Sequence, residues 1–139
     1  ARHICALTGE ASLADDSGLC VDALGGEPGV HSARYSGMGD LQNNLLLLSK
    51  MKGIKNRKCR FVCAAALCFP DGSVITAEGV SEGELLYDFD GEGGFGYDSI
   101  FYSLELKKSF GKATPQEKNS VSHRYKALKE LARKARDLI

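Results

Sequence analysis

Two adjacent carboxylates, Asp15 and Asp16, follow a short apolar segment and precede Ser17 and Gly18. Neighbouring negative charges repel each other unless a cation or hydrogen-bond donors compensate them. Mg²⁺ commonly binds one or two carboxylates together with substrate phosphates. Asp-Asp-Ser-Gly is also favourable turn chemistry, and for the run taken alone a turn is the more common case. The run therefore predicts either a metal-binding acidic pair or an acidic turn.

A glycine-rich loop, Gly93–Asp98, carries two aromatic residues and one acid. Glycines allow a backbone to approach a planar ligand closely, and Phe95 or Tyr97 could stack on a purine ring. The structural alternative is a glycine turn whose aromatic side chains fill the core. For the loop taken alone, this structural alternative is the better interpretation.

Three cationic or neutral donors, Lys118, His123 and Arg124, lie near the start of the last expected helix. A helix N-terminus favours anionic groups, so these side chains could face a phosphate or another acceptor. The alternatives are a solvated lysine and a surface histidine. Arg34 is equally suited to a structural ion pair and to a ligand contact.

Together these blocks closely resemble the Ham1-like family of inosine/xanthosine triphosphate pyrophosphatases. One block alone would be a weak signal, whereas four collinear blocks make accidental similarity very unlikely. The resemblance covers essentially the whole chain. The matching blocks are Ala14–Leu19, Pro28–Gly37, Gly94–Asp98, and Lys118 with Ser122-His123-Arg124.

The resemblance implies hydrolysis of ITP, dITP or XTP to the monophosphate and pyrophosphate, with Mg²⁺ as cofactor and usually in a homodimer. It makes Asp16 the catalytic and metal-contacting residue, with Asp15 either a second metal ligand or a structural acid. A pyrophosphatase acting on modified pyrimidines fits the blocks less well. The residues implied in substrate binding are Ser17, Phe95, Gly96, Tyr97, Asp98, Lys118, His123 and Arg124.

The chain departs from the family pattern at its start. Family members open with a Thr/Ser-x-Asn-x-x-Lys phosphate loop and later carry a metal-binding Glu, and neither is found here. Thr8-Gly9 has no Asn or Lys at the matching spacing, and Ala1–Gly9 is expected to be the end of a helix. The sequence thus predicts an N-terminally truncated chain. The rival interpretation is a catalytically impaired nucleotide-binding or structural remnant.

Composition predicts one domain over residues 1–139, because 43% hydrophobic residues suffice for a core at this length. The 18 basic and 18 acidic residues cancel, which argues against binding to nucleic acid or a membrane driven mainly by charge. No stretch has the length of a membrane span, and the start is no signal peptide. Five cysteines without zinc spacing predict buried free thiols at Cys59, Cys63 and Cys68 in a cytoplasmic protein.

The expected fold is α/β, with a mixed twisted sheet, flanking helices and a nucleotide cleft between two lobes. One long helix is expected after Thr114, which with Pro115 and Glu117 forms a capping box and leads into an apolar stripe. A core helix is expected at 41–51 and a hairpin turn at Pro70-Asp71-Gly72. Strands are expected at 11–14, 19–21, 60–69, 73–80, 84–87 and 99–102.

Overall fold

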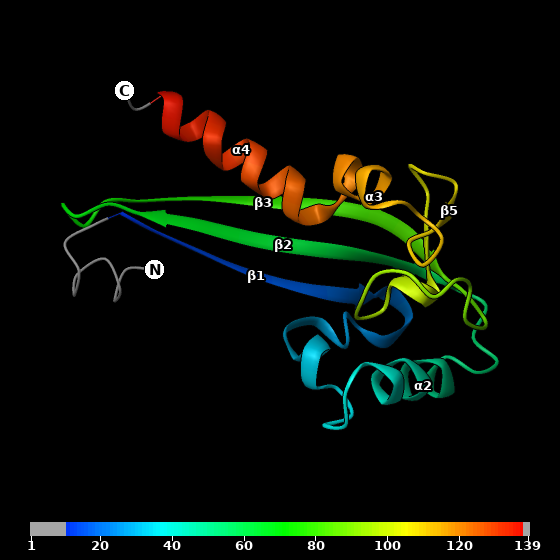
Figure 1. Ribbon diagram of the computed structural model, residues 1–139. Helices are drawn as coiled ribbons and strands as arrows, with labels where there is room; N and C mark the ends of the chain where they lie inside the picture. The colour runs from blue at the N-terminus through cyan, green and yellow to red at the C-terminus, as the bar shows by residue number, and fades with distance from the viewer. Residues whose placement is uncertain (1–10, 138–139) are drawn as a thin grey trace.

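One five-stranded sheet organises the molecule in the computed structural model, which describes residues 11–137 (Figure 1). The strand order follows the chain, and every described pairing is antiparallel. The α/β class is confirmed, whereas the described sheet is antiparallel rather than mixed. The strands are β1 (Ser12–Val21), β2 (Lys58–Cys68), β3 (Val74–Leu85), β4 (Phe101–Ser103) and β5 (Lys108–Ser109).

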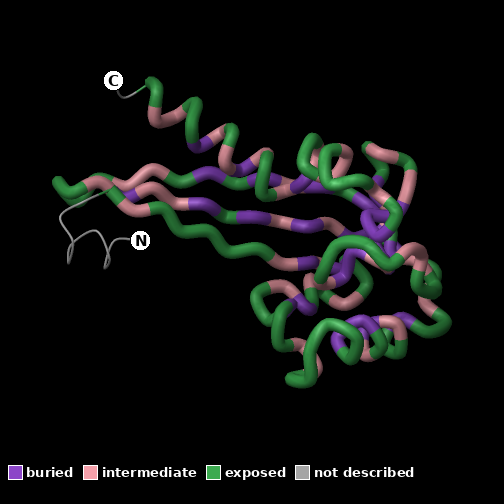
Figure 2. Tube along the Cα trace, in the orientation of Figure 1, coloured by how far each residue is buried: buried purple, intermediate pink, exposed green. Residues whose placement is uncertain are grey.

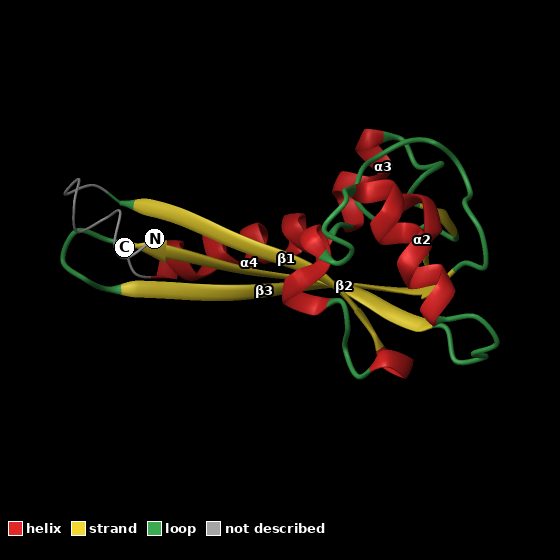
Figure 3. Ribbon diagram, turned by 90° about the horizontal axis from the view of Figure 1, so that it is seen from below, coloured by secondary structure: helices red, strands yellow, loops and turns green. Residues whose placement is uncertain are grey.

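The first three strands form a long arm that is covered on one face by α4 (His123–Asp137) (Figure 1). Seen from below, β1 to β3 run side by side, and α2 (Asp40–Lys50) and α3 (Pro115–Val121) lie toward one end of the arm (Figure 3). The hairpin between β2 and β3 confirms the predicted turn, where Asp71 accepts a 2.8 Å hydrogen bond from the backbone of Ser73. Three short 3₁₀ helices complete the structure: η1 (Asp22–Leu24), η2 (Gly29–Arg34) and η3 (Asp98–Ile100).

The predicted acidic turn is wrong, because β1 passes straight through the Asp-Asp-Ser-Gly run. Asp15 pairs with Ala65 and Asp16 with Ala64 in one continuous register. Both acids are exposed on the outer strand of the described sheet, where their charges remain hydrated. Gly18 serves another purpose than turning the chain: a Cβ there would lie 2.3 Å from the carbonyl oxygen of Gly29. The glycine therefore lets η2 pack directly against β1.

The predicted last helix is two helices. Ser122 separates α3 from α4 with an extended backbone, its ψ being 151°. The Ser122 hydroxyl then accepts the backbone N–H of Tyr125 at 3.1 Å, as a capping residue does. The predicted capping box of Thr114 and Glu117 is confirmed. The break at Ser122 thus ends α3 and lets a separate helix, α4, begin at His123.

The buried hydrophobic residues within 11–137 form two groups. Figure 2 marks the buried positions along the chain in purple. The larger group joins the ends of β1 to β3 with α2 and the segment around β4, and the smaller one lies between α4 and the arm. The expected burial of Cys59, Cys63 and Cys68 is confirmed. Burial raises the pKa of the Cys59 thiol to about 12, so that thiol stays protonated.

Helix α2 confirms the predicted core helix, but not all of its leucines are buried. Leu47 is fully buried, whereas Leu41 and Leu45 are 61% and 43% exposed. Two asparagines, Asn43 and Asn44, are buried on the inner side instead. Asn43 accepts the backbone N–H of Ser36 and donates to the carbonyl of Ala33, and Asn44 donates to the carbonyl of Gly96. The helix therefore holds neighbouring backbone segments by hydrogen bonds as well as contributing to the apolar core.

The remaining strand predictions also need correction. The two strands predicted at 73–80 and 84–87 are one strand, β3, which ends at Leu85, where the Arg57 guanidinium donates to the carbonyls of Leu85 and Leu86 at 3.0 and 2.8 Å. The segment 98–100 is the 3₁₀ helix η3, and β4 begins at Phe101. The expected helix end at Ala1–Gly9 lies outside the described residues. Among residues 11–137, no helix combines the length and the apolar character that crossing a membrane requires.

Candidate ligand-binding cavity

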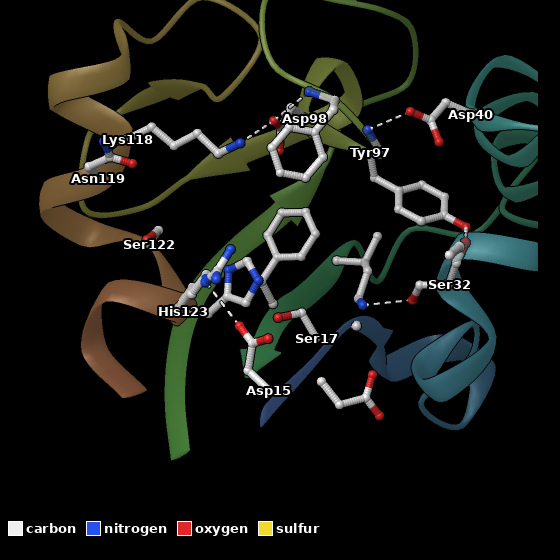
Figure 4. A pocket seen from close by; sticks show the side chains of 18 residues that line it. Asp15, Ser17, Ser32, Asp40, Tyr97, Asp98, Lys118, Asn119, Ser122 and His123 are labelled. Carbon is white, nitrogen blue, oxygen red and sulfur yellow. Dashed lines mark hydrogen bonds and ion pairs between the residues drawn. The ribbon is translucent and has the colours of Figure 1, made fainter. Parts of the chain in front are cut away.

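A cavity of about 520 Å³ opens where β1, η2, the glycine-rich loop and the junction of α3 and α4 meet (Figure 4). Its lining combines acidic, basic, aromatic and glycine residues from segments far apart in the chain. Every residue predicted to belong to the site contributes to this lining: Asp15, Asp16, Ser17, Phe95, Gly96, Tyr97, Asp98, Lys118, His123 and Arg124.

The two aspartates of β1 differ in their surroundings because successive strand residues point to opposite faces. Asp15 is opposite Ala65, which packs under α4, and its carboxylate forms an ion pair with Arg124, Oδ2 lying 2.9 Å from Nε. Asp16 points to the other face and forms no hydrogen bond or ion pair with any residue in 11–137. Asp16 therefore offers a free carboxylate at the rim of the cavity.

The glycine-rich loop is held in place by hydrogen bonds within the loop and to helix α2. The backbone N–H of Phe95 donates to Asp98 Oδ2 at 2.9 Å, and the N–H of Gly96 donates to Asp40 Oδ2 at 2.9 Å. Asn44 donates to the carbonyl of Gly96 at 2.8 Å. Gly94 has a φ of 76°, and a Cβ there would lie 2.1 Å from Asp98 Oδ2. The loop thus takes a conformation that requires glycine at this position.

The two aromatic residues of the loop do different jobs. Tyr97 is only 4% exposed and donates its hydroxyl hydrogen to the carbonyl of Ser32 at 2.7 Å. Burial raises the pKa of the Tyr97 hydroxyl, so it remains a donor. Phe95 is 76% exposed and presents its ring at the cavity. Of the two rings proposed for stacking, only that of Phe95 is accessible. Tyr97 instead anchors the loop through its hydrogen bond to Ser32.

Lys118 closes the cavity on the α3 side. Its ammonium forms an ion pair with Asp98 and lies 4.1 Å from the centroid of the Phe95 ring. Both partners of the ion pair are well covered, the Asp98 side chain being 5% exposed. A cation over an aromatic face is attracted by the ring quadrupole. A flat ligand that stacks on that face of Phe95 would have to displace the ammonium.

His123 begins α4 and stacks on Phe61, with ring centroids 4.9 Å apart and planes at 17°. Burial lowers the pKa of His123 to about 4, helped by the charges of Lys118 and Arg124 and opposed by Asp15. The imidazole is therefore neutral near pH 7 and offers one donor and one acceptor. Its Nδ1 is buried and has no hydrogen-bond partner among the described residues.

A glycine makes this position of His123 possible. A Cβ on Gly79 of β3 would lie 2.0 Å from the His123 carbonyl oxygen and 2.4 Å from the Ala127 nitrogen. The start of α4 therefore rests directly on the backbone of β3. The sequence shows this glycine only as an interruption of a strand pattern, which is a signal of close backbone approach.

Sequence reasoning assigned no role to Ser32, although this residue ties the cavity together. Its Oγ accepts the backbone N–H of Leu19 at 2.9 Å and donates to the Gly29 carbonyl at 2.7 Å. Its own carbonyl accepts the Tyr97 hydroxyl. Asp40, Asn44 and Phe61 were likewise missed, because their contacts join segments distant in sequence. Arg34, for which an ion pair and a ligand contact were equally expected, does not line this cavity, and no ion pair joins it to a described residue.

The fold and this cavity define an α/β protein with a concave site lined by aromatic, acidic and basic side chains. The model of the Ham1 family matches residues 1–134. The dITP/XTP pyrophosphatase of Desulforamulus reducens is 52% identical over 127 residues, covering 88% of this chain and 63% of that protein. The dITP/XTP pyrophosphatase of Thermus thermophilus is 48% identical over 140 residues, covering 99% and 68%.

Solved structures agree with these sequence matches. The Ham1 protein of Staphylococcus aureus superposes with a TM-score of 0.91 at 37% identity, covering 96% of this chain and 70% of that one. A HAM1 protein from Coxiella burnetii gives a TM-score of 0.91 at 36% identity, covering 99% and 73%. The chain belongs to the Ham1 family. It spans about two thirds of the length of the curated relatives it matches.

Proposed function

We propose that the protein hydrolyses deaminated purine nucleoside triphosphates, namely ITP, dITP and XTP, to the monophosphate and pyrophosphate. The observation that carries the proposal is one cavity with a stacking ring, donors on α3 and α4, and a free carboxylate on β1. The names of the relatives, dITP/XTP pyrophosphatases, support the same reaction.

In this proposal the purine base occupies the side of the cavity between Phe95 and the start of α4. The base displaces the Lys118 ammonium from the face of the Phe95 ring and stacks there. Lys118, His123 and Arg124 then face the edge of the base. Arg124 can only donate hydrogen bonds, and Lys118 is likewise a donor. A 6-oxo purine presents an acceptor at the position where adenine presents an amino donor. This lining therefore suits inosine and xanthine better than adenine.

The phosphates extend toward β1 in this proposal, where Asp16 is the free carboxylate. A carboxylate so placed can orient a water molecule and accept its proton as the water oxygen attacks the α-phosphorus. The bond between the α-phosphorus and the pyrophosphate oxygen breaks as the new phosphorus–oxygen bond forms. Ser17, next to Asp16 on the exposed strand, is within the same lining and is proposed to contact the substrate.

The residues present fit a Mg²⁺ ion in part. Asp16 is a hard oxygen ligand that no described residue neutralises, whereas Asp15 is engaged by Arg124. Residues 11–137 contain no cluster of three or more His, Cys, Asp or Glu side chains that could hold a metal. Asp16 would therefore hold the ion together with substrate phosphates, and the ion would offset the phosphate charge.

The rival proposal is a nucleotide-binding chain with impaired catalysis. Measuring pyrophosphate release from ITP, XTP and ATP, with and without Mg²⁺, separates the two proposals. Binding of ITP without release of pyrophosphate would favour the rival. The homodimer implied by the resemblance and the cytoplasmic location predicted from the cysteines stay predictions, which light scattering and fractionation can test.

A further inference from the structure

We propose that Asp15 is a positioning residue that holds Arg124 in the orientation needed to read the base. The proposal rests on the proposed function, because it assigns Arg124 to the base. The observation is the ion pair between Asp15 Oδ2 and Arg124 Nε, drawn as a dashed line at Asp15 in Figure 4. The pair joins the edge of β1 to the first turn of α4 across the wall of the cavity.

The geometry of the pair leaves the terminal N–H groups of the Arg124 guanidinium free. Arginine has five N–H donors, and Asp15 Oδ2 lies 2.9 Å from Nε, the inner of the three guanidinium nitrogens. Neither terminal nitrogen of Arg124 forms a hydrogen bond or an ion pair with another residue in 11–137. The terminal N–H groups therefore remain for a ligand while the ion pair holds the inner end of the guanidinium.

The pair is poorly suited to a purely stabilising role. The Arg124 side chain is 64% exposed and that of Asp15 is 30% exposed. Ion pairs with this much solvent around them contribute little to folding stability. Holding a long side chain in one conformation before the ligand arrives instead reduces the entropy lost on binding.

The strand register assigns separate tasks to the two aspartates. Asp15 is on the α4 face and Asp16 on the opposite face, so a single side chain cannot exchange between the two environments. In the acidic pair, Asp15 thus orients Arg124, and Asp16 stays free at the rim of the cavity. This division explains why both positions are acidic while only one carboxylate is unpaired.

The test measures the dissociation constant of inosine monophosphate by calorimetry, using the protein expressed from its natural start codon. Asp15→Ala should weaken binding about 3- to 10-fold, and Asp15→Glu should recover most of this loss. In an Arg124→Ala background, Asp15→Ala should produce no further weakening. The midpoint of Mg²⁺ activation of ITP turnover should stay unchanged in Asp15→Ala.

The matched control is Asp22→Ala, because Asp22 forms a comparable exposed ion pair with Arg60 outside the cavity. This variant changes the net charge equally and should bind inosine monophosphate like the parent protein. Unfolding in urea should be alike for the Asp15 and Asp22 variants.

Three results would overturn the proposal. Unchanged binding by Asp15→Ala, where Arg124→Ala binds weakly, removes Asp15 but leaves the proposed function standing. A shifted Mg²⁺ midpoint with normal nucleotide binding makes Asp15 a metal ligand instead. A parent protein that neither binds inosine monophosphate nor releases pyrophosphate overturns the proposed function as well.

Discussion

Asp98 and Lys118 form an ion pair that fastens the glycine-rich loop to α3. The same oxygen of Asp98 that receives the ammonium also accepts the backbone N–H of Phe95 at 2.9 Å. One carboxylate oxygen therefore fixes both the stacking ring and the cation that lies over it. The side chain of Asp98 is 5% exposed, so its charge depends on these two donors.

Replacing Asp98 by Ala should lower the free energy of unfolding by about 3 kcal/mol, because the change leaves a covered ammonium and a backbone donor without an acceptor. Urea denaturation measures the change. Glu130→Ala, which removes an exposed ion pair of α4, is the control and should alter stability little. Equal stability of the Asp98 variant and the parent protein would show that the ion pair does not hold the loop.

Asp16→Asn should remove most turnover while leaving the fold intact. The substitution is isosteric but cannot accept a proton from water, and general-base contributions of about 10²- to 10⁴-fold are typical. Pyrophosphate release from ITP measures the effect, and thermal melting checks the fold. Asp22→Asn on the neighbouring segment controls for loss of one negative charge. Near-normal turnover of Asp16→Asn at saturating Mg²⁺ would remove Asp16 from the mechanism.

ITP and XTP should exceed ATP in catalytic efficiency, and Arg124→Ala should narrow the gap. Each donor that adenine leaves buried without a partner costs about 1–3 kcal/mol, or about 5- to 150-fold in efficiency. Competition between ITP and ATP in one reaction gives the ratio directly. Should ATP be hydrolysed as efficiently as ITP, the base-reading role of these donors fails.

His123 should make the protein less stable in mild acid. Its pKa of about 4 is below the ordinary value of 6.5, so between these values the unfolded chain binds a proton that the folded protein rejects. The contribution to stability is therefore complete above about pH 6.5 and falls as the pH drops toward 4. The loss should be about 1–3 kcal/mol once solvent screening is allowed for.

Urea unfolding of the parent protein and His123→Gln, measured from pH 7 down to pH 4, isolates this contribution. In the variant, the free energy of unfolding should depend much less on pH, since glutamine does not titrate. The charged groups that act on the imidazole are Lys118, Arg124 and Asp15. Identical slopes for both proteins would show that His123 titrates normally in the folded state.

The sequence predicted the major elements because local signals specify them. The apolar run from Arg60 with its Pro-Asp-Gly turn, and the capping box at Thr114, are both confirmed. The acidic run was misinterpreted as a turn, because Asp, Ser and Gly favour turns locally but here pair along β2. Tertiary pairing overrides such local preference.

The sequence predicted residues that line one cavity, but it did not predict their individual environments. All ten predicted residues line one cavity, since their order along the chain matched a family pattern. That Tyr97 is buried and Phe95 accessible depends on the distant Ser32 carbonyl. The support supplied by Gly79 and Ser32 likewise arises from packing between segments that no local pattern connects.

The ion pair of Asp15 and Arg124 joins positions separated by nearly the whole described chain. Contacts between such distant positions form only after large loops have closed, so the cavity should be among the last features to assemble during folding. Because of this ion pair, a bound ligand should restrain β1 and the start of α4 at the same time. Inosine monophosphate should therefore slow amide hydrogen exchange in β1 and in the first turns of α4 together.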